Sequence, residues 1–127
     1  MLQDTSDRLA DRMRRGDVFS TECPSREVLK HMTSTWGVLI LIALRPGTLR
    51  FSELRRKVNG VSERMLAQTL QQLEGDGLLT RRSFPVVPPH VEYSLTDLGQ
   101  EAAAQVETLV DWIQDRLPAL IGAKHDA

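Results

Sequence analysis

Three long polar side chains recur on one side of a short predicted helix. Arg64, Gln68 and Gln71 are separated by four and three positions, which places them on one helical face. Arginine and glutamine carry the hydrogen-bond donors and acceptors that read base edges in a DNA groove. Ser62, just before this helix, adds a hydroxyl that can cap the helix or contact a ligand. Glutamine is also a good helix former on a solvated face, so the two glutamines alone leave that interpretation open.

Basic residues are concentrated around this helix. Residues 45–82 contain eight Lys/Arg and four Asp/Glu, a net charge of +4, whereas residues 83–127 carry −5 and residues 1–44 are neutral. The total of −1 over 127 residues is therefore a cancellation. A local positive charge attracts phosphate without making the whole protein basic, although a solvated helical face has the same pattern. The candidate phosphate contacts are Arg50, Arg55, Arg56, Arg81, Arg82 and His90.

Hydrophobic spacing predicts the elements that position these side chains. The helix expected at residues 63–75 begins after Ser62 and carries a buried stripe opposite its polar face. Asn59-Gly60 predicts a tight turn before it. Ser52 predicts the cap of a shorter helix that ends near Val58. The buried stripe of the longer helix is Leu66, Leu70 and Leu73, and the core pair of the shorter helix is Leu54 and Val58.

The flanking segments complete a recognisable order of elements. Pro24 predicts the start of one helix, and the nine-residue apolar run Trp36–Leu44 predicts a helix in the middle of the core. This run is far shorter than the roughly 20 residues that span a bilayer. Residues 78–84 and 90–95 are expected to be strands, the second with Val91, Tyr93 and Leu95 alternating, and the prolines are confined to the tip between them. Helix, turn, helix and hairpin make a winged helix-turn-helix, whose second helix enters the major groove of DNA.

The fold class expected is therefore mainly α (α+β). We expect the winged helix-turn-helix core at residues 23–96, with its wing at 78–95. An N-terminal arm helix at residues 1–16 and a C-terminal dimerisation helix at 97–121 flank this core. A single modest hydrophobic core suits a chain of 127 residues that is 41% hydrophobic.

The C-terminal helix carries more apolar positions than a core of this size needs. Left uncovered, they would form a large apolar patch, which usually marks an interface. A two-fold dimer would place two recognition helices about 34 Å apart, one turn of DNA. The alternative is that the helix folds back over its own domain. The residues expected to form the dimer are Leu9, Met13, Val106, Leu109, Val110, Ile113 and Leu117.

Several motifs occur together and in one order. A Cys-Pro pair opens a helix at residue 23, and RFSELRR, SERML, LEGDGLLTR and PPHVEYSLTDLG follow between residues 50 and 99. Over residues 23–99 the chain resembles the HxlR-type winged-helix transcriptional regulators of the MarR-like superfamily. The resemblance implies a bacterial homodimer that binds an inverted-repeat operator through double-stranded DNA, with the flanking helices forming the dimer. We expect a repressor.

Two positions depart from the pattern of the resembled family. His90 stands where the family often has a basic residue before the second wing strand, and Ser34-Thr35-Trp36 replaces its common G-K-W. A neutral histidine is a weaker phosphate partner than arginine. The departures therefore shift the expected phosphate affinity toward Arg50, Arg55, Arg56 and Arg82.

Cys23 is the single cysteine of the chain. It precedes Pro24 at a predicted helix N-terminus, where the helix dipole stabilises a thiolate. The resemblance implies that a cysteine at this position senses oxidants or electrophiles in some members. With one thiol per chain, a disulfide could join only two subunits. The alternative is a small hydrophobic residue that simply packs.

Other classes of function find little support. His31, His90 and His125 are scattered rather than set at ligand spacing, so no metal site is expected. The chain has neither a Gly-rich phosphate loop nor a G-x-S-x-G elbow, and we expect no enzyme activity and no cofactor. The N-terminus lacks an apolar stretch, so no signal peptide and no membrane partner are expected, and one cysteine suits the reducing cytoplasm.

Two further alternatives stay open at this point. The winged helix could serve contacts with another protein instead of DNA. It could also respond to a small apolar or aromatic effector, held between the dimer helices and the core. The residues that would line such an effector site are Met32, Trp36, Phe51 and Trp112.

Overall fold

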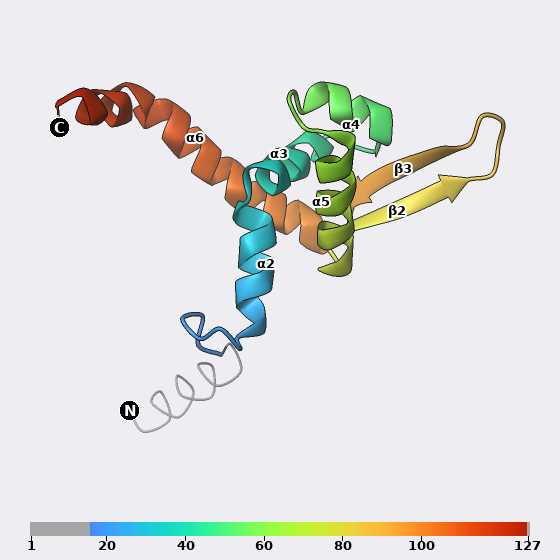
Figure 1. Ribbon diagram of the computed structural model, residues 1–127, viewed down its shortest axis with the longest axis horizontal. Coiled ribbons are helices and arrows are strands. Elements are labelled where there is room, and N and C mark those ends of the chain that lie inside the picture. The colour runs from blue at the N-terminus through green and yellow to red at the C-terminus, as the bar shows by residue number, and fades with distance from the viewer. Residues whose placement is uncertain (1–15, 127) are drawn as a thin grey trace.

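The computed structural model describes residues 16–126, which contain five helices and a three-stranded antiparallel sheet in the order β1-β3-β2. The elements are α2 (Pro24–Thr33), α3 (Thr35–Leu44), β1 (Leu49–Arg50), α4 (Phe51–Lys57), α5 (Glu63–Gly75), β2 (Leu79–Phe84), β3 (His90–Leu95) and α6 (Asp97–Asp126). The β2–β3 hairpin extends from one side of the body and the distal part of α6 from the other (Figure 1). This is the α+β winged helix-turn-helix that the sequence predicts. The expected N-terminal arm helix, with Leu9 and Met13, lies outside the described residues apart from Gly16.

Helix α3 forms the centre of the hydrophobic core. Ile40, Leu41 and Leu44 are fully buried, as expected for a helix that is apolar nearly all round. Its N-terminus is capped by the Ser34 hydroxyl, which accepts a hydrogen bond from the Gly37 N–H at 3.1 Å. Within the described residues no single helix is long and apolar enough to cross a membrane, and α2 and α3 meet that test only together, across a 74° bend.

Helices α4 and α5 form the helix-turn-helix. The turn between them contains Gly60 at φ +94°, a backbone conformation that favours glycine. Ser62 caps α5 as predicted, because its hydroxyl accepts a hydrogen bond from the Met65 N–H at 3.1 Å. The predicted core positions of both helices are buried, and they are Leu54, Val58, Leu66, Leu70 and Leu73.

The start of α4 differs from the prediction that Ser52 caps it. Arg50 is the N-cap residue, and its N–H donates to the Glu53 carboxylate at 2.9 Å. The reason is the short strand β1, in which Arg50 pairs with Glu92 of β3. This pairing holds Arg50 in an extended conformation, so the helix begins at Phe51 and Ser52 is already helical. A two-residue strand leaves no periodicity for the sequence to reveal.

The wing is the β2–β3 hairpin. Its ladder runs from Leu79 opposite Leu95 to Phe84 opposite His90, and the three tip prolines lie outside it, as predicted. Side chains alternate between the two faces of a strand, and directly opposed residues share a face. Arg81 therefore lies on the same face as buried Tyr93, and Arg82 lies on the other face with Glu92.

Helix α6 begins where the sequence predicts and runs beyond the expected end at residue 121. The Thr96 hydroxyl caps it by accepting a hydrogen bond from the Gly99 N–H at 3.0 Å. A side chain at Gly99 would overlap the Leu78 carbonyl, so glycine allows the helix to approach β2 closely. The first half packs on α3, and the helix continues through Pro118 to Asp126.

Candidate nucleic-acid interface

The outer face of α5 has the polar row that the sequence predicts. Arg64, Gln68 and Gln71 are all exposed, on the side of the helix away from its buried leucine stripe. None of these three side chains forms a hydrogen bond or an ion pair with another residue in the range 16–126. Ser62 is exposed as well, but its hydroxyl is engaged as the helix cap. The face therefore presents donors and acceptors that have no partner within the described part of the chain.

An ion pair links the start of α5 to α4. The Arg55 guanidinium donates to the Glu63 carboxylate at 2.8 Å, and the two side chains are 47% and 70% exposed. The positive charge of Arg55 is thus partly balanced by Glu63. Sequence reasoning did not include Glu63 in the site, although the first turn of a recognition helix is where base edges are contacted.

The basic residues of α4 line a shallow groove beside this pair. The groove has a volume of about 430 Å³ and is bordered by Phe51, Ser52, Arg55, Arg56 and Glu63. Arg50, at the N-cap of α4, is exposed next to it. The structure therefore places three of the predicted phosphate contacts along one short helix, next to the first turn of α5.

The two wing arginines point to opposite faces of the hairpin. Arg82 lies with its guanidinium carbon 4.8 Å from the centre of the Phe84 ring, and that ring stacks on His90 with centroids 4.7 Å apart. The His90 ring is half-buried, and its Nε2 lies 3.5 Å from the Glu92 carboxylate. The histidine is therefore part of a stack that supports Arg82.

Arg81 instead faces α5. It borders a small cavity with Gln71, Glu74 and Tyr93, so it lies between the recognition helix and the wing. Arg81 and Arg82 are predicted together as phosphate contacts. Because successive side chains of a strand point to opposite faces, the two arginines lie on different sides of the wing.

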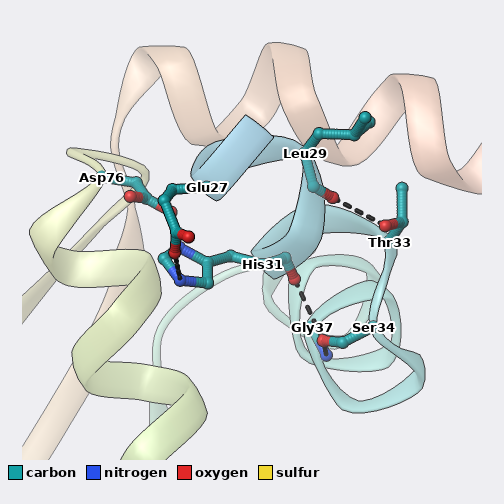
Figure 2. A network of polar contacts seen from close by, with 7 residues as sticks. All are labelled: Glu27, Leu29, His31, Thr33, Ser34, Gly37 and Asp76. Atoms are coloured by element: carbon teal, nitrogen blue, oxygen red, sulfur yellow. Dashed lines mark hydrogen bonds and ion pairs between the residues drawn. The ribbon is translucent and has the colours of Figure 1, made fainter. Parts of the chain in front are cut away.

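The far end of α5 is tied to α2 through His31 and Asp76. The ring Nδ1 lies 2.6 Å from the Asp76 carboxylate, and the two side chains are only 14% and 12% exposed. Figure 2 shows the His31 ring directed from α2 toward the end of α5, with Glu27 beside it. This contact was not predicted, because no local pattern connects positions that are 45 residues apart.

The chain matches a known protein family over most of its length. Residues 31–120 match the HxlR-like helix-turn-helix family. The chain belongs to the HxlR-like helix-turn-helix family. It is therefore a transcriptional regulator with a helix-turn-helix DNA-binding fold.

Individual relatives cover most of the chain. YtfH of Escherichia coli strain K12, named as an HTH-type transcriptional regulator, is 58% identical over 118 residues, which are 93% of this chain and 94% of YtfH. The solved YtfH structure from Salmonella typhimurium is 63% identical with a TM-score of 0.83, over 87% of this chain and 98% of that one. The redox regulator HypR in its reduced form is 31% identical with a TM-score of 0.70, over 78% of this chain and 98% of HypR. All three of these relatives are named as regulators.

Within this HxlR-like fold, Cys23 occupies the N-cap of α2, with Pro24 in the first turn. The helix N-terminus is therefore where the sequence predicts it. Cys23 is 6% exposed, and a side chain at Gly16 would come within 3.1 Å of its sulfur. Cys23 is thus packed beneath the segment that enters α2.

The apolar positions of α6 separate into two groups. Val106 is buried in the core of its own domain and Val110 packs against that core, so the structure removes Val106 from the predicted dimer surface. The reason is that the first half of α6 packs on α3, where Arg45 also pairs with Glu107. Beyond Val110 the side chains through Ile121 are exposed. The exposed large apolar residues are Leu109, Trp112, Ile113, Leu117, Leu120 and Ile121.

The residues named for an effector site do not line one cavity among those described. Met32, Trp36 and Phe51 pack against the core, and Trp112 is exposed on α6. A different open groove of about 830 Å³ lies where α3, the end of α4 and α6 meet, and Leu39, Ile42 and Lys57 border it. Among the residues that the structure describes, no cluster of three or more His, Cys, Asp or Glu side chains could hold a metal ion.

Proposed function

We propose that the chain is a homodimeric repressor that binds an inverted-repeat operator in double-stranded DNA. The observation that carries this proposal is the outer face of α5. Arg64, Gln68 and Gln71 are exposed there above a fully buried leucine stripe. A polar row on a rigid support, following a capped turn, suits the reading of base edges in the major groove.

The remaining polar residues are assigned to the DNA backbone. Phosphate contacts fix the position of a protein on the duplex, whereas base contacts select the sequence. Arg50, Arg55 and Arg56 would hold the strand beside α4, and Arg82 on its Phe84–His90 stack would hold it beside the wing. Arg81, between wing and α5, is placed to reach the edge of the same groove. Ser62 adds a hydroxyl at the start of the recognition helix.

The distal half of α6 supports the homodimer. Leu109, Ile113 and Leu117 are exposed at four-residue spacing, and Trp112 and Leu120 extend this apolar surface. A second copy related by a two-fold axis is a natural cover, because the same stripe then packs on itself. Two α5 helices on one face of the duplex would match half-sites about 34 Å apart, and an occupied operator would exclude other proteins from the promoter.

Binding to DNA selected by the protein itself tests this function. Duplexes enriched from a random pool would be titrated by fluorescence anisotropy at several salt concentrations, with a scrambled duplex as control. We expect an inverted repeat to be enriched and bound at least about 10³-fold more tightly than scrambled DNA. We also expect log K to fall steeply with log salt as counterions are released from phosphates. Failure to enrich any sequence, or affinity independent of salt, would contradict the proposal. Repression is tested separately with a reporter gene placed behind the operator.

Control by oxidants or electrophiles through Cys23 is proposed in addition. The thiol lies at the N-terminus of α2, and the similar protein HypR is named a redox regulator. Oxidation by a hypochlorite- or diamide-type agent would remove two electrons and two protons from two thiols and join two subunits by one disulfide. This step requires the buried Cys23 side chains to become exposed. Operator binding would be compared before and after oxidant for wild type and Cys23→Ser, with non-reducing electrophoresis. An oxidant response that persists in Cys23→Ser contradicts this role.

A further inference from the structure

The His31–Asp76 contact joins two functional parts of the fold. Asp76 is the C-cap residue of α5 and is followed by Gly77 at φ +78° and then by strand β2. At this junction the Leu78 N–H donates to the Leu73 carbonyl at 3.0 Å and the Gly77 N–H to the Glu74 carbonyl at 2.9 Å. This is the Schellman arrangement that ends a helix. Asp76 therefore lies where the recognition helix becomes the wing.

Electrostatics make Asp76 dependent on its partner. The C-terminus of a helix carries about half a negative charge, and α5 has no basic residue in its last turn. A carboxylate there is unfavourable unless a donor faces it. A carboxylate only accepts hydrogen bonds, so Nδ1–H of His31 donates, across 2.6 Å. With the pair largely shielded from solvent, removing one partner leaves the other poorly compensated.

His31 is itself held firmly by its backbone. Its carbonyl accepts a hydrogen bond from the Ser34 hydroxyl at 3.1 Å. A side chain at Gly37 would overlap the same carbonyl, so the last turn of α2 lies directly against the first turn of α3 (Figure 2). The ring thus extends from a fixed point on the core to the end of α5.

We propose that the His31–Asp76 pair is a positioning link that sets the orientation of the recognition helix and wing relative to α2. Operator affinity then depends on a contact between His31 of α2 and Asp76, at the end of α5 opposite the first turn expected to read bases. The proposal rests on the DNA-binding function proposed above. Helix α2 begins after Cys23, about 12 Å along the helix from His31, so a movement of α2 reaches α5 through this contact.

Binding of an operator duplex by variants of the full chain tests the link. The probe is the duplex that wild type enriches from random DNA, and the scrambled duplex is the control. We expect Asp76→Asn and His31→Leu each to weaken operator binding about 5- to 20-fold, and the double variant to be no weaker than the weaker single variant. Scrambled DNA should be bound within twofold of wild type. Melting temperatures establish that each variant is folded at the assay temperature.

Two amide substitutions separate positioning from mere structural support. The amide nitrogen of asparagine lies near the position of the ring Nδ1, whereas that of glutamine lies near Nε2. His31→Asn should therefore bind the operator within about threefold of wild type, whereas His31→Gln should lose affinity as His31→Leu does. Glu27→Gln is the matched control, because the Glu27 carboxylate is exposed and 3.7 Å from the other ring nitrogen, and it should leave affinity unchanged.

Several results would overturn the positioning role. Operator affinity within twofold of wild type in both Asp76→Asn and His31→Leu would do so, as would equal loss on operator and scrambled DNA. NMR of the His31 side chain needs no variant. Disappearance of the hydrogen bond from Nδ1–H to Asp76 in the operator complex would also refute the positioning role. Failure of the wild type to enrich any duplex would instead refute the DNA-binding proposal itself.

Discussion

Helices α5 and α6 both carry leucines at helical spacing, yet the structure uses them in opposite ways. In α5 the leucines at 66, 70 and 73 are buried and the opposite face is polar and exposed. In the distal half of α6 the apolar positions are exposed instead. An exposed polar face needs no cover beyond water and is free to contact a polar partner, whereas a large exposed apolar stripe usually marks an interface.

The difference arises from where each helix meets the core. Helix α5 contacts α3, α2 and β2, so its stripe is covered within the protomer. Helix α6 contacts α3 along its first half, where Ala102 and Ala103 are buried. The helix then extends away from the body of the protein (Figure 1), and its large apolar side chains there are exposed. Leucines at helical spacing are therefore buried in α5 and exposed in distal α6, because α6 is longer than the core that covers it.

The largest effect should come from the buried stripe of α5. Leu70 is 1% exposed, and Leu70→Ala should reduce the free energy of unfolding by about 2–5 kcal/mol because it leaves a cavity. Leu117→Ala on exposed α6 is the matched control and should leave the stability of the folded domain nearly unchanged. Urea denaturation at several protein concentrations separates the domain from the dimer contribution. Similar losses in the free energy of unfolding for both variants at high dilution would contradict the view that only the α5 stripe stabilises the domain.

Charges in the α6 stripe should break the proposed dimer and leave the domain folded. Ile113→Glu with Leu117→Glu places two carboxylates in a surface that is expected to be apolar and buried in the dimer. We expect the dimer dissociation constant to rise at least about 100-fold, about 2.7 kcal/mol, with unchanged circular dichroism. Sedimentation equilibrium measures this change, and Gln114→Glu, which adds one carboxylate to the same helix, serves as a control. A wild-type monomer at micromolar concentration would refute the dimer.

Local pattern was sufficient to predict much of the fold. The Ser62 cap, the leucine stripe of α5, the apolar helix α3 and the start of α6 each depend on residues within a few positions of one another. The same locality explains why the exposed polar face of α5 was predicted correctly.

What could not be predicted depends on tertiary contacts. Strand β1 exists only because Leu49 and Arg50 pair with β3. The burial of Val106 reflects packing of α6 on α3. The His31–Asp76 pair joins positions far apart in the sequence, and the pairing of β2 with β3 decides which face of the wing each of Arg81 and Arg82 occupies. Each of these features becomes visible only when distant segments are placed together.

Substitution in the polar face of α5 should alter recognition without altering the fold. Arg64→Ala removes an exposed side chain, and we expect it to reduce discrimination between operator and scrambled DNA by about 1–3 kcal/mol. Arg56→Ala on α4 should weaken binding to both duplexes equally and make the salt dependence about one unit shallower. Anisotropy titrations of the two variants compare the roles directly. Equal losses on both duplexes for Arg64→Ala would show that this residue contacts the backbone.

The smallest effect concerns the Arg55–Glu63 pair at the start of α5. An exposed pair of this kind contributes about 0.2–1 kcal/mol, so Glu63→Gln should hardly change stability. It removes a negative charge next to the DNA and releases Arg55 for a phosphate. We therefore expect about 2- to 5-fold tighter binding to any duplex, with a salt slope about one unit steeper. Weaker binding confined to the operator would mean instead that Glu63 accepts a hydrogen bond from a base such as cytosine, which would extend the reading face of α5 to its first residue.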